Sequence, residues 1–231
     1  ADQKTRWLTA IASGEALLTG AFGNGDAATP GTIAAKRDAS GWTLTGTASM
    51  VPAADLATRI LVPARVDNGF AIFLIDPQAQ GVSLTRNATS RGEPVFDLAL
   101  GHVVVPEADL LGGGTMPNAR ALDRIRAQAT IATCALQVGV SERALELTSA
   151  YVRERIQFGV PIGSFQAVQH RLADAYIDVQ SMRWVMWRAA WKLSNGQDAT
   201  REVAVAKFWA AEGGARVAAS AQHLHGGMGV D

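Results

Sequence analysis

The chain has 231 residues, 48% of them hydrophobic, and its 21 Lys and Arg are balanced by 21 Asp and Glu. This size suits one large or two smaller domains, and the zero net charge excludes the strongly basic surface that binds nucleic acid or anionic membranes. A single cysteine excludes an internal disulfide and no apolar run approaches the roughly 20 residues of a membrane helix, so we expect a cytoplasmic protein that binds neutral ligands or other proteins.

Residues 1–118 are rich in the residues that break helices and form turns. Seven of the eight prolines and fourteen of the 23 glycines lie there. Between them are short runs of β-branched and aromatic residues, at residues 41–46, 59–62, 69–76, 81–84 and 98–105. Five or more such strands predict an antiparallel β-barrel or sandwich, preceded by a short helix over residues 1–11.

After residue 118 the apolar residues recur at steps of three and four, which predicts helices. A first helix runs to about Arg155, and a second and a third are expected over Phe165–Leu193 and Ala199–Leu224. Three long helices with brief connections predict an antiparallel bundle. We therefore expect an α+β multidomain chain, with a β domain at residues 1–118 and an incomplete helical bundle at residues 119–231. The expected buried stripe of the first helix is Leu122, Ile125, Ala129, Ala132, Leu136, Gly139, Val140, Ala144 and Leu147.

Three local patterns could carry chemistry, and each has a structural alternative. The glycine-rich segment Gly20–Asp26 could approach a phosphate or a flat ligand, but an ordinary turn is favoured. His223 and His225 point to different sides of a helix, and Cys134 has no Cys or His at ligand spacing, so no metal site is predicted. Three tryptophans share one helical face, which favours core or subunit-interface packing over a stacking platform. These are Trp184, Trp187 and Trp191.

The segment from Tyr151 to Asp174 carries the most specific pattern in the chain. An Arg-x-x-Phe-Gly turn at residues 155–159 leads to Pro-Ile, Phe-Gln and Gln-His-x-Leu-Ala-Asp in one ungapped stretch. This segment closely resembles the signature of the acyl-CoA dehydrogenase family. The resemblance continues in order along the chain, at Gly14-Glu15, Gly41-Trp42 with Gly46, Asp76-Pro77, Gly81-Val82, Val105-Pro106 and the closing His-Gly-Gly-Met-Gly.

The resemblance implies a fold and a redox reaction. Family members have an N-terminal helical domain, a middle β domain and a C-terminal four-helix bundle, so we expect this chain to lack the first domain and part of the last. They assemble as dimers or tetramers and act in lipid metabolism and β-oxidation. They carry out α,β-dehydrogenation of an acyl-CoA thioester: a carboxylate removes the α-proton, the β-hydride passes to FAD, and the electrons leave to an electron-transferring flavoprotein.

The residues that the resemblance assigns to a neighbouring subunit's FAD have suitable side chains. In the family, the Arg-x-x-Phe-Gly turn reaches across the subunit interface to the pyrophosphate and adenine, and a later glutamine and a Gly-Gly pair contact the same cofactor. These positions are Arg155, Gln157, Phe158, Gln166, Gly226 and Gly227. The glutamine usual before the Gly-Gly pair is replaced by His223, whose imidazole still forms hydrogen bonds.

The residues that would hold this chain's own flavin match the family less well. In the family's Thr-Glu-Pro-x-Ala-Gly-Ser-Asp loop, Thr19 and Asp26 match, whereas the Glu, Pro and Ser positions differ. They are occupied by Gly20, Ala21 and Gly25. The flavin-covering Trp-x-Thr segment becomes Met50-Val51-Pro52, and proline offers neither a hydroxyl nor an N–H.

No residue of the chain is assigned as the catalytic base. Ala129 occupies the position that carries the base in some family members, and Thr130 that of a neighbouring CoA-binding arginine. Other members place a catalytic glutamate beyond the Gly-Gly pair, in a segment outside this chain.

These departures favour a subunit that completes the FAD site of a more conventional partner, in a heterotetramer. One alternative is an ordinary homotetrameric acyl-CoA dehydrogenase whose base lies outside this chain, and another is a non-enzymatic oligomeric scaffold that binds no flavin. The acyl group is not identified. Small residues at Ala127–Ala135 could leave room for a bulky acyl group, although close helix packing is the slightly preferred explanation.

Overall fold

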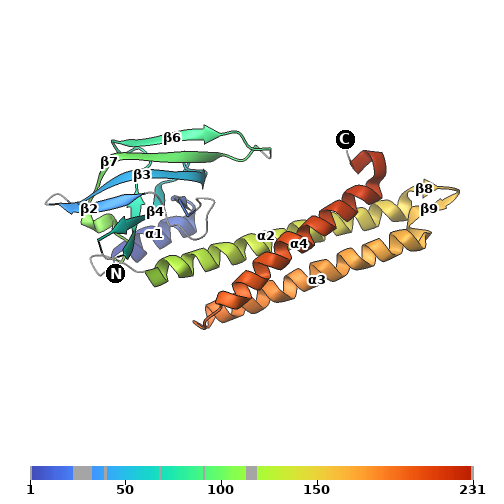
Figure 1. The fold of residues 1–231 in the computed structure, drawn as a ribbon. Coiled ribbons are helices and arrows are strands. Elements are labelled where there is room, and N and C mark those ends of the chain that lie inside the picture. The colour runs from blue at the N-terminus through green and yellow to red at the C-terminus, as the bar shows by residue number, and fades with distance from the viewer. Residues whose placement is uncertain are drawn as a thin grey trace. The chain divides into compact units, whose positions relative to one another are not determined.

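The computed structural model of the chain describes residues 2–22, 33–38, 41–67, 69–90, 92–112 and 119–229. The chain divides into two compact units, Ala1–Asp123 and Arg124–Asp231, and the boundary lies just inside the first long helix (Figure 1). A seven-stranded sheet forms most of the first unit, and three long helices form most of the second. This architecture confirms the predicted fold class, a mostly antiparallel β unit followed by a helical bundle.

The first unit is built on one sheet with strand order β1-β4-β2-β3-β7-β6, and β5 also pairs with β4. Its elements are α1 (Asp2–Ser13), β1 (Leu18–Gly20), β2 (Ala34–Asp38), β3 (Gly41–Pro52), β4 (Arg59–Val66), β5 (Gly69–Ile75), β6 (Val82–Asn87), β7 (Val95–Val105) and η1 (Glu107–Asp109). Most neighbouring strands are antiparallel, but β1 and β2 each pair with β4 in parallel. The sequence pattern missed β1 and β2 because both are short and poor in β-branched residues.

Strand β5 pairs with β4 and is buried on both faces. Phe73 and Ile75 pack into the main core with residues such as Leu98. Leu74 points to the opposite face and packs against Trp7 of α1. A strand covered on both sides needs a continuous apolar run, which explains why this segment shows no polar alternation.

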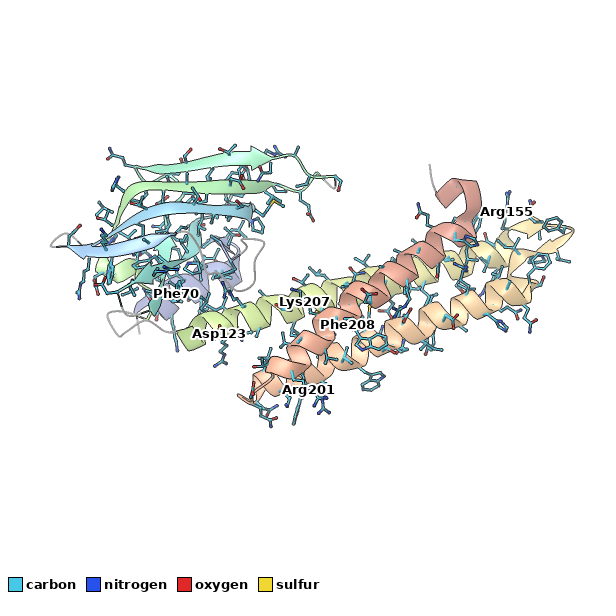
Figure 2. All side chains as sticks on the ribbon, viewed as in Figure 1. Phe70, Asp123, Arg155, Arg201, Lys207 and Phe208 are labelled. Atoms are coloured by element: carbon cyan, nitrogen blue, oxygen red, sulfur yellow. The ribbon has the colours of Figure 1, made fainter. Side chains whose placement is uncertain are left out.

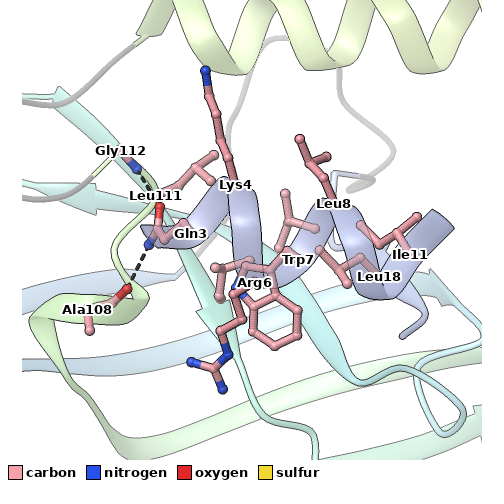
Figure 3. A pocket seen from close by; sticks show the side chains of 12 residues that line it. Gln3, Lys4, Arg6, Trp7, Leu8, Ile11, Leu18, Ala108, Leu111 and Gly112 are labelled. Carbon is pink, nitrogen blue, oxygen red and sulfur yellow. Dashed lines mark hydrogen bonds between the residues drawn. The ribbon is translucent and has the colours of Figure 1, made fainter. Parts of the chain in front are cut away.

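Helix α1 is fastened to the rest of the first unit by polar and apolar contacts. The Gln3 side chain donates hydrogen bonds to the carbonyl oxygens of Ala108 (2.7 Å) and Leu110 (2.9 Å), and it accepts one from the Gly112 N–H (3.1 Å). Figure 3 shows this anchor beside a pocket of about 980 Å³ that Trp7 helps to line. The short helix expected over residues 1–11 is therefore confirmed, and it covers one face of β5.

Two glycines of the family-like motifs are required by the sheet itself. Gly41 has a φ of +131°, and an added Cβ would lie 2.7 Å from the Val105 carbonyl oxygen. Gly81 has a φ of +88°, and its Cβ would lie 2.5 Å from the Gly101 carbonyl oxygen. Only glycine fits both restrictions. These motif positions are thus explained by the backbone of the first unit.

The second unit consists of α2 (Ala119–Glu154), β8 (Ile156–Gln157), β9 (Val160–Pro161), η2 (Ile162–Ser164), α3 (Gln166–Ser194), α4 (Thr200–His225) and η3 (Gly226–Gly229). Two buried clusters take residues from all three helices. Their members are Ile131, Cys134, Met186, Ala189, Ala206 and Ala210 in one, and Val138, Ala175, Val179, Met182 and Val217 in the other. Ion pairs of Arg216 with Asp178 (2.6 Å) and of Arg183 with Glu142 link the helices at the edge of these clusters.

The predicted buried face of α2 is wrong along most of the helix, although Leu122 is buried as expected. Leu136, Val140 and Leu147 are 71%, 64% and 50% exposed. The buried face instead contains Ile131, Cys134, Val138, Ser141, Thr148 and Val152. Both faces have helical spacing. The buried face is hard to recognise in the sequence because it includes two polar residues, Ser141 and Thr148, whose hydroxyls form hydrogen bonds within α2. Thr148 donates to the Ala144 carbonyl oxygen (2.7 Å), and the Gln137 side-chain amide donates to Ser141 Oγ (3.1 Å).

The three tryptophans of α3 lie outside the core of the second unit. Trp184, Trp187 and Trp191 are 72%, 60% and 59% exposed, whereas Met182 on the same helix is 1% exposed. The structure therefore excludes the expected core role within this chain, and subunit-interface packing stays a prediction. Within the part of the chain that the structure describes, no helix has the length and apolar character to cross a membrane.

The two faces of α3 predict contrasting effects of truncation. We expect Met182→Ala to lower the free energy of unfolding by about 2–5 kcal/mol, because it leaves a cavity among all three helices. Trp187→Ala should change it by less than about 0.5 kcal/mol, because the ring is mostly exposed. Urea denaturation followed by circular dichroism measures both, and equal losses in the two variants would contradict the described packing.

Candidate functional site

The segment after α2 forms a β-hairpin whose two strands have two residues each, and the sequence pattern did not predict it. Strand β8 pairs with β9, and Phe158 and Gly159 make the connection with φ values of +55° and +80°. Two successive positive φ angles are typical of a type I′ turn. The base of the hairpin is held by hydrogen bonds from the Arg155 N–H to the Tyr151 carbonyl oxygen (2.9 Å) and from the Ile162 N–H to the Arg155 carbonyl oxygen (2.8 Å).

Phe158 adopts an unfavourable backbone conformation in this turn, and its contacts within the second unit do not compensate for the free energy that this costs. The left-handed region disfavours a residue with a Cβ by roughly 1–2 kcal/mol, and Asn or Gly is the usual occupant. The ring makes one edge contact with Phe165, at a centroid separation of 6.1 Å, yet Phe158 is 92% exposed. A strained and exposed phenylalanine is suited to contact with another molecule.

The other polar residues named from the sequence lie around the same hairpin. Arg155 is exposed at its base (Figure 2), and its guanidinium makes no hydrogen bond or ion pair with the residues that the structure describes. Gln157 donates from Nε2 to the Ile156 carbonyl oxygen (2.8 Å), which leaves its side-chain oxygen as an acceptor. Gln166 is the first residue of α3, where the helix dipole favours negative charge.

Of the three glycines at the end of α4, two are required by the local backbone and one is not. Gly226 has φ +64° and ψ −137°, a conformation that favours glycine. An added Cβ at Gly229 would lie 2.2 Å from the Gln222 carbonyl oxygen. Gly227 has neither restriction, since its φ is not in the left-handed range and its Cβ would meet nothing within 4 Å. The backbone at Gly227 is therefore open to close approach by another molecule.

A ring contact that the sequence did not reveal brings these two segments together. The Tyr151 and His225 rings stack with a centroid separation of 4.5 Å and an interplanar angle of 23°. The hairpin after α2 and the glycine turn after α4 thus lie at the same end of the bundle, and His223 is exposed in the last turn of α4. Among the described residues, no group of three or more His, Cys, Asp or Glu is arranged to hold a metal.

Thr19, the remaining predicted site residue, lies in the first unit. Its hydroxyl donates a hydrogen bond to the Pro52 carbonyl oxygen (2.6 Å), so the two poorly matching segments lie side by side. Pro52 is flanked by strained backbone, with φ +58° at Met50 and +47° at Ala53. Of the glycine-rich segment, Gly20, Ala21 and Phe22 are described, and the expected role of residues 23–26 lies outside the described residues.

The backbone at Met50 is held by a carboxylate on the neighbouring strand. The Asp97 Oδ1 atom accepts hydrogen bonds from the Asn87 side chain (2.9 Å) and the Met50 N–H (3.3 Å). These bonds favour the charged form and keep the pKa of Asp97 below its usual value. At neutral pH the carboxylate is therefore ionised and fixes the segment that leads to Pro52.

Comparison with known proteins finds similarity to acyl-CoA dehydrogenases. Residues 121–231 match the model for the acyl-CoA dehydrogenase C-terminal domain. Across an alignment of 237 residues, the chain is 40% identical to acyl-CoA dehydrogenase FadE27 of Mycobacterium tuberculosis. This alignment covers 97% of this chain and 61% of FadE27.

Two solved structures are similar along the chain. The ChsE4-ChsE5 complex from Mycobacterium tuberculosis matches with a TM-score of 0.88 and 40% identity, over 97% of this chain and 60% of that chain. A variant of the Tcur3481-Tcur3483 steroid ACAD matches with a TM-score of 0.89 and 39% identity, over 100% of this chain and 62% of that chain. The chain thus spans about three fifths of the length of these relatives.

The glycines after α4 predict opposite responses to a single methyl group. Gly229→Ala forces the turn away from the Gln222 carbonyl oxygen, and such overpacking costs about 1–3 kcal/mol. We expect backbone amides of residues 222–229 to exchange about tenfold faster with deuterium, measured by mass spectrometry. Gly227→Ala is the matched control and should leave exchange unchanged. Equal acceleration in both variants would contradict the described turn.

Proposed function

Because this chain belongs to the acyl-CoA dehydrogenase family, we propose that it is part of an FAD-dependent enzyme that dehydrogenates an acyl-CoA thioester at the α and β carbons. The observation that supports this most directly is the strained and exposed Phe158 turn beside the unpaired Arg155. In the family resemblance these residues contact a neighbour's FAD. FAD supplies the hydride acceptor for the β-hydrogen, and an electron-transferring flavoprotein is the proposed recipient of the electrons.

The chemistry of the bundle end fits the adenosine diphosphate half of FAD. The Arg155 guanidinium is suited to bind pyrophosphate oxygens through two parallel hydrogen bonds. The Phe158 ring offers an apolar surface for the adenine. Gly227 allows the backbone to come close to the cofactor, and the Gln166 amide and the His223 imidazole can donate or accept hydrogen bonds. All five groups are side chains or backbone of the second unit.

We further propose that these groups complete the FAD site of a partner subunit in a heterotetramer. The first unit supplies poorer groups for a flavin of its own, because the Thr19 hydroxyl hydrogen is used on the Pro52 carbonyl and Pro52 has no N–H. The similar ChsE4-ChsE5 structure is a complex of two different subunits. A chain that offers FAD contacts to a neighbouring subunit, and has fewer groups to bind an FAD of its own, is consistent with a complex of two different subunits.

The proposed substrate is an acyl-CoA with a bulky acyl group. Ala129, Ala132 and Ala135 form a small-residue surface on α2 that is exposed in the second unit, so close packing among its three helices does not account for them. One of the similar structures is described as a steroid ACAD. Together with the exposed Leu136 on the same face, these small residues form an apolar surface that could accommodate a ring system of that size. The catalytic base is not assigned to any residue of this chain.

Arginine and phenylalanine substitutions at the hairpin test the proposed FAD contact. In the assembled enzyme, we expect Arg155→Ala to raise the dissociation constant for FAD by about 10- to 100-fold, because a hydrogen bond to a charged group contributes about 1.5–3 kcal/mol. Phe158→Asn should also raise it, while leaving the free energy of unfolding equal or higher because the turn strain is relieved. Fluorescence titration of the apoprotein with FAD gives the dissociation constants.

Arg153→Ala is the matched control for this experiment. Arg153 is exposed in the last turn of α2, two residues before Arg155, and no cofactor contact is proposed for it. Its substitution should change FAD affinity less than about twofold. If Arg155→Ala and Phe158→Asn both bind FAD as tightly as the unmodified enzyme, the proposed function is wrong.

A further inference from the structure

Tyr151 contacts the residues on both sides of the Gly226-Gly227 pair. Its ring stacks on His225, which comes immediately before the glycines, at a centroid separation of 4.5 Å. Its hydroxyl lies 4.0 Å from the Sδ atom of Met228, which comes immediately after them. A single side chain from the end of α2 therefore holds the glycine turn at the end of α4.

The same tyrosine is bonded to the hairpin that carries the other proposed FAD contacts. The Tyr151 carbonyl oxygen accepts the Arg155 N–H at 2.9 Å, and the Arg155 carbonyl oxygen accepts the Ile162 N–H at 2.8 Å. Ring and backbone of one residue thus join two segments that are about seventy residues apart in sequence.

The His225 ring is held in one orientation by its own helix. Its Nδ1 atom lies 2.8 Å from the Ala221 carbonyl oxygen, one turn earlier in α4. Because a carbonyl oxygen only accepts hydrogen bonds, Nδ1 carries the proton in this contact. The hydrogen bond within α4 therefore orients the imidazole independently of Tyr151, and the stack has a defined geometry.

The glycine pair depends on such outside support. Glycines have no side chain to anchor them, and Gly226 adopts a positive φ that few other residues share. The Gly226 N–H bonds to the His223 carbonyl oxygen within α4, and the flanking side chains connect the turn to the neighbouring helix. A binding group must be held within about 0.5 Å of its productive position, so a displaced turn would not contact the cofactor together with Arg155.

We propose that Tyr151 and His225 are a positioning pair, which sets the separation between the Arg155–Phe158 hairpin and the Gly226-Gly227 turn so that both contact one FAD. The proposal rests on the proposed function, because it assigns the two residues a role toward the same cofactor. Neither ring is assigned a contact with FAD itself. Their effect on affinity is exerted through Arg155 and Gly227.

The test compares FAD dissociation constants in the assembled enzyme that contains the full chain. We expect Tyr151→Ala to raise the dissociation constant about tenfold, since an aromatic pair contributes roughly one factor of ten beyond its buried area. Tyr151→Phe keeps the stack and should retain most of the affinity. Tyr176→Ala, which removes the exposed tyrosine of α3, is the matched control and should have no effect. If Tyr151→Ala fails to fold, His225→Gln removes the ring and should give the same loss.

A double variant separates positioning from a general loss of stability. In an Arg155→Ala background, Tyr151→Ala should raise the dissociation constant by less than about threefold, because the hairpin then offers only Phe158 to be aligned with the glycine turn. A full tenfold effect in that background, or no effect in the unmodified enzyme, would overturn the proposal. If Arg155→Ala and Phe158→Asn both leave FAD binding unchanged, the proposed function fails first, and the two failures are thereby distinguished.

Discussion

The close packing of α4 against the other two helices is the constraint on which the second unit depends. An added Cβ at Gly214 would lie 2.4 Å from the Gln137 Nε2 atom, and one at Gly213 would lie 3.1 Å from the Met182 side chain. A glycine inside a helix costs about 1 kcal/mol relative to alanine, so two adjacent ones need a reason. Here they let three helices share two small cores, composed mostly of alanine, valine and methionine. The same packing brings the ends of α2 and α4 close enough for the Tyr151–His225 stack.

The features at this end of the bundle are unfavourable or neutral for the chain alone. Phe158 strains its turn and exposes its ring, Arg155 has no internal partner in the described structure, and Gly227 is not required by its own backbone. Local rules of folding are commonly broken where a molecule must bind something else. A cofactor shared with a partner subunit would account for these departures together, since each one offers a group to FAD.

The sequence predicted the elements of the second unit well and their packing poorly. Helix α3 was expected over Phe165–Leu193 and spans Gln166–Ser194, because Asn195 and Gly196 end it as the pattern indicates. The sequence pattern does not identify the buried face of α2, since Leu136 and Val138 both belong to stripes with helical spacing and only the neighbouring helices decide which is buried. The β8–β9 hairpin was missed because its two-residue strands are too short to show alternation. The residues proposed to contact FAD were named through a family resemblance. Their strain, their exposure and the stack that joins them required the structure.

The flavin content of purified protein shows whether this chain supplies FAD contacts to a partner subunit. The full-length chain would be expressed alone and together with a homologous subunit encoded beside it, and FAD would be measured by absorbance and related to protein concentration. We expect little flavin in the chain alone and stoichiometric flavin in the assembly. Stoichiometric FAD together with acyl-CoA oxidation by the chain alone would contradict this expectation.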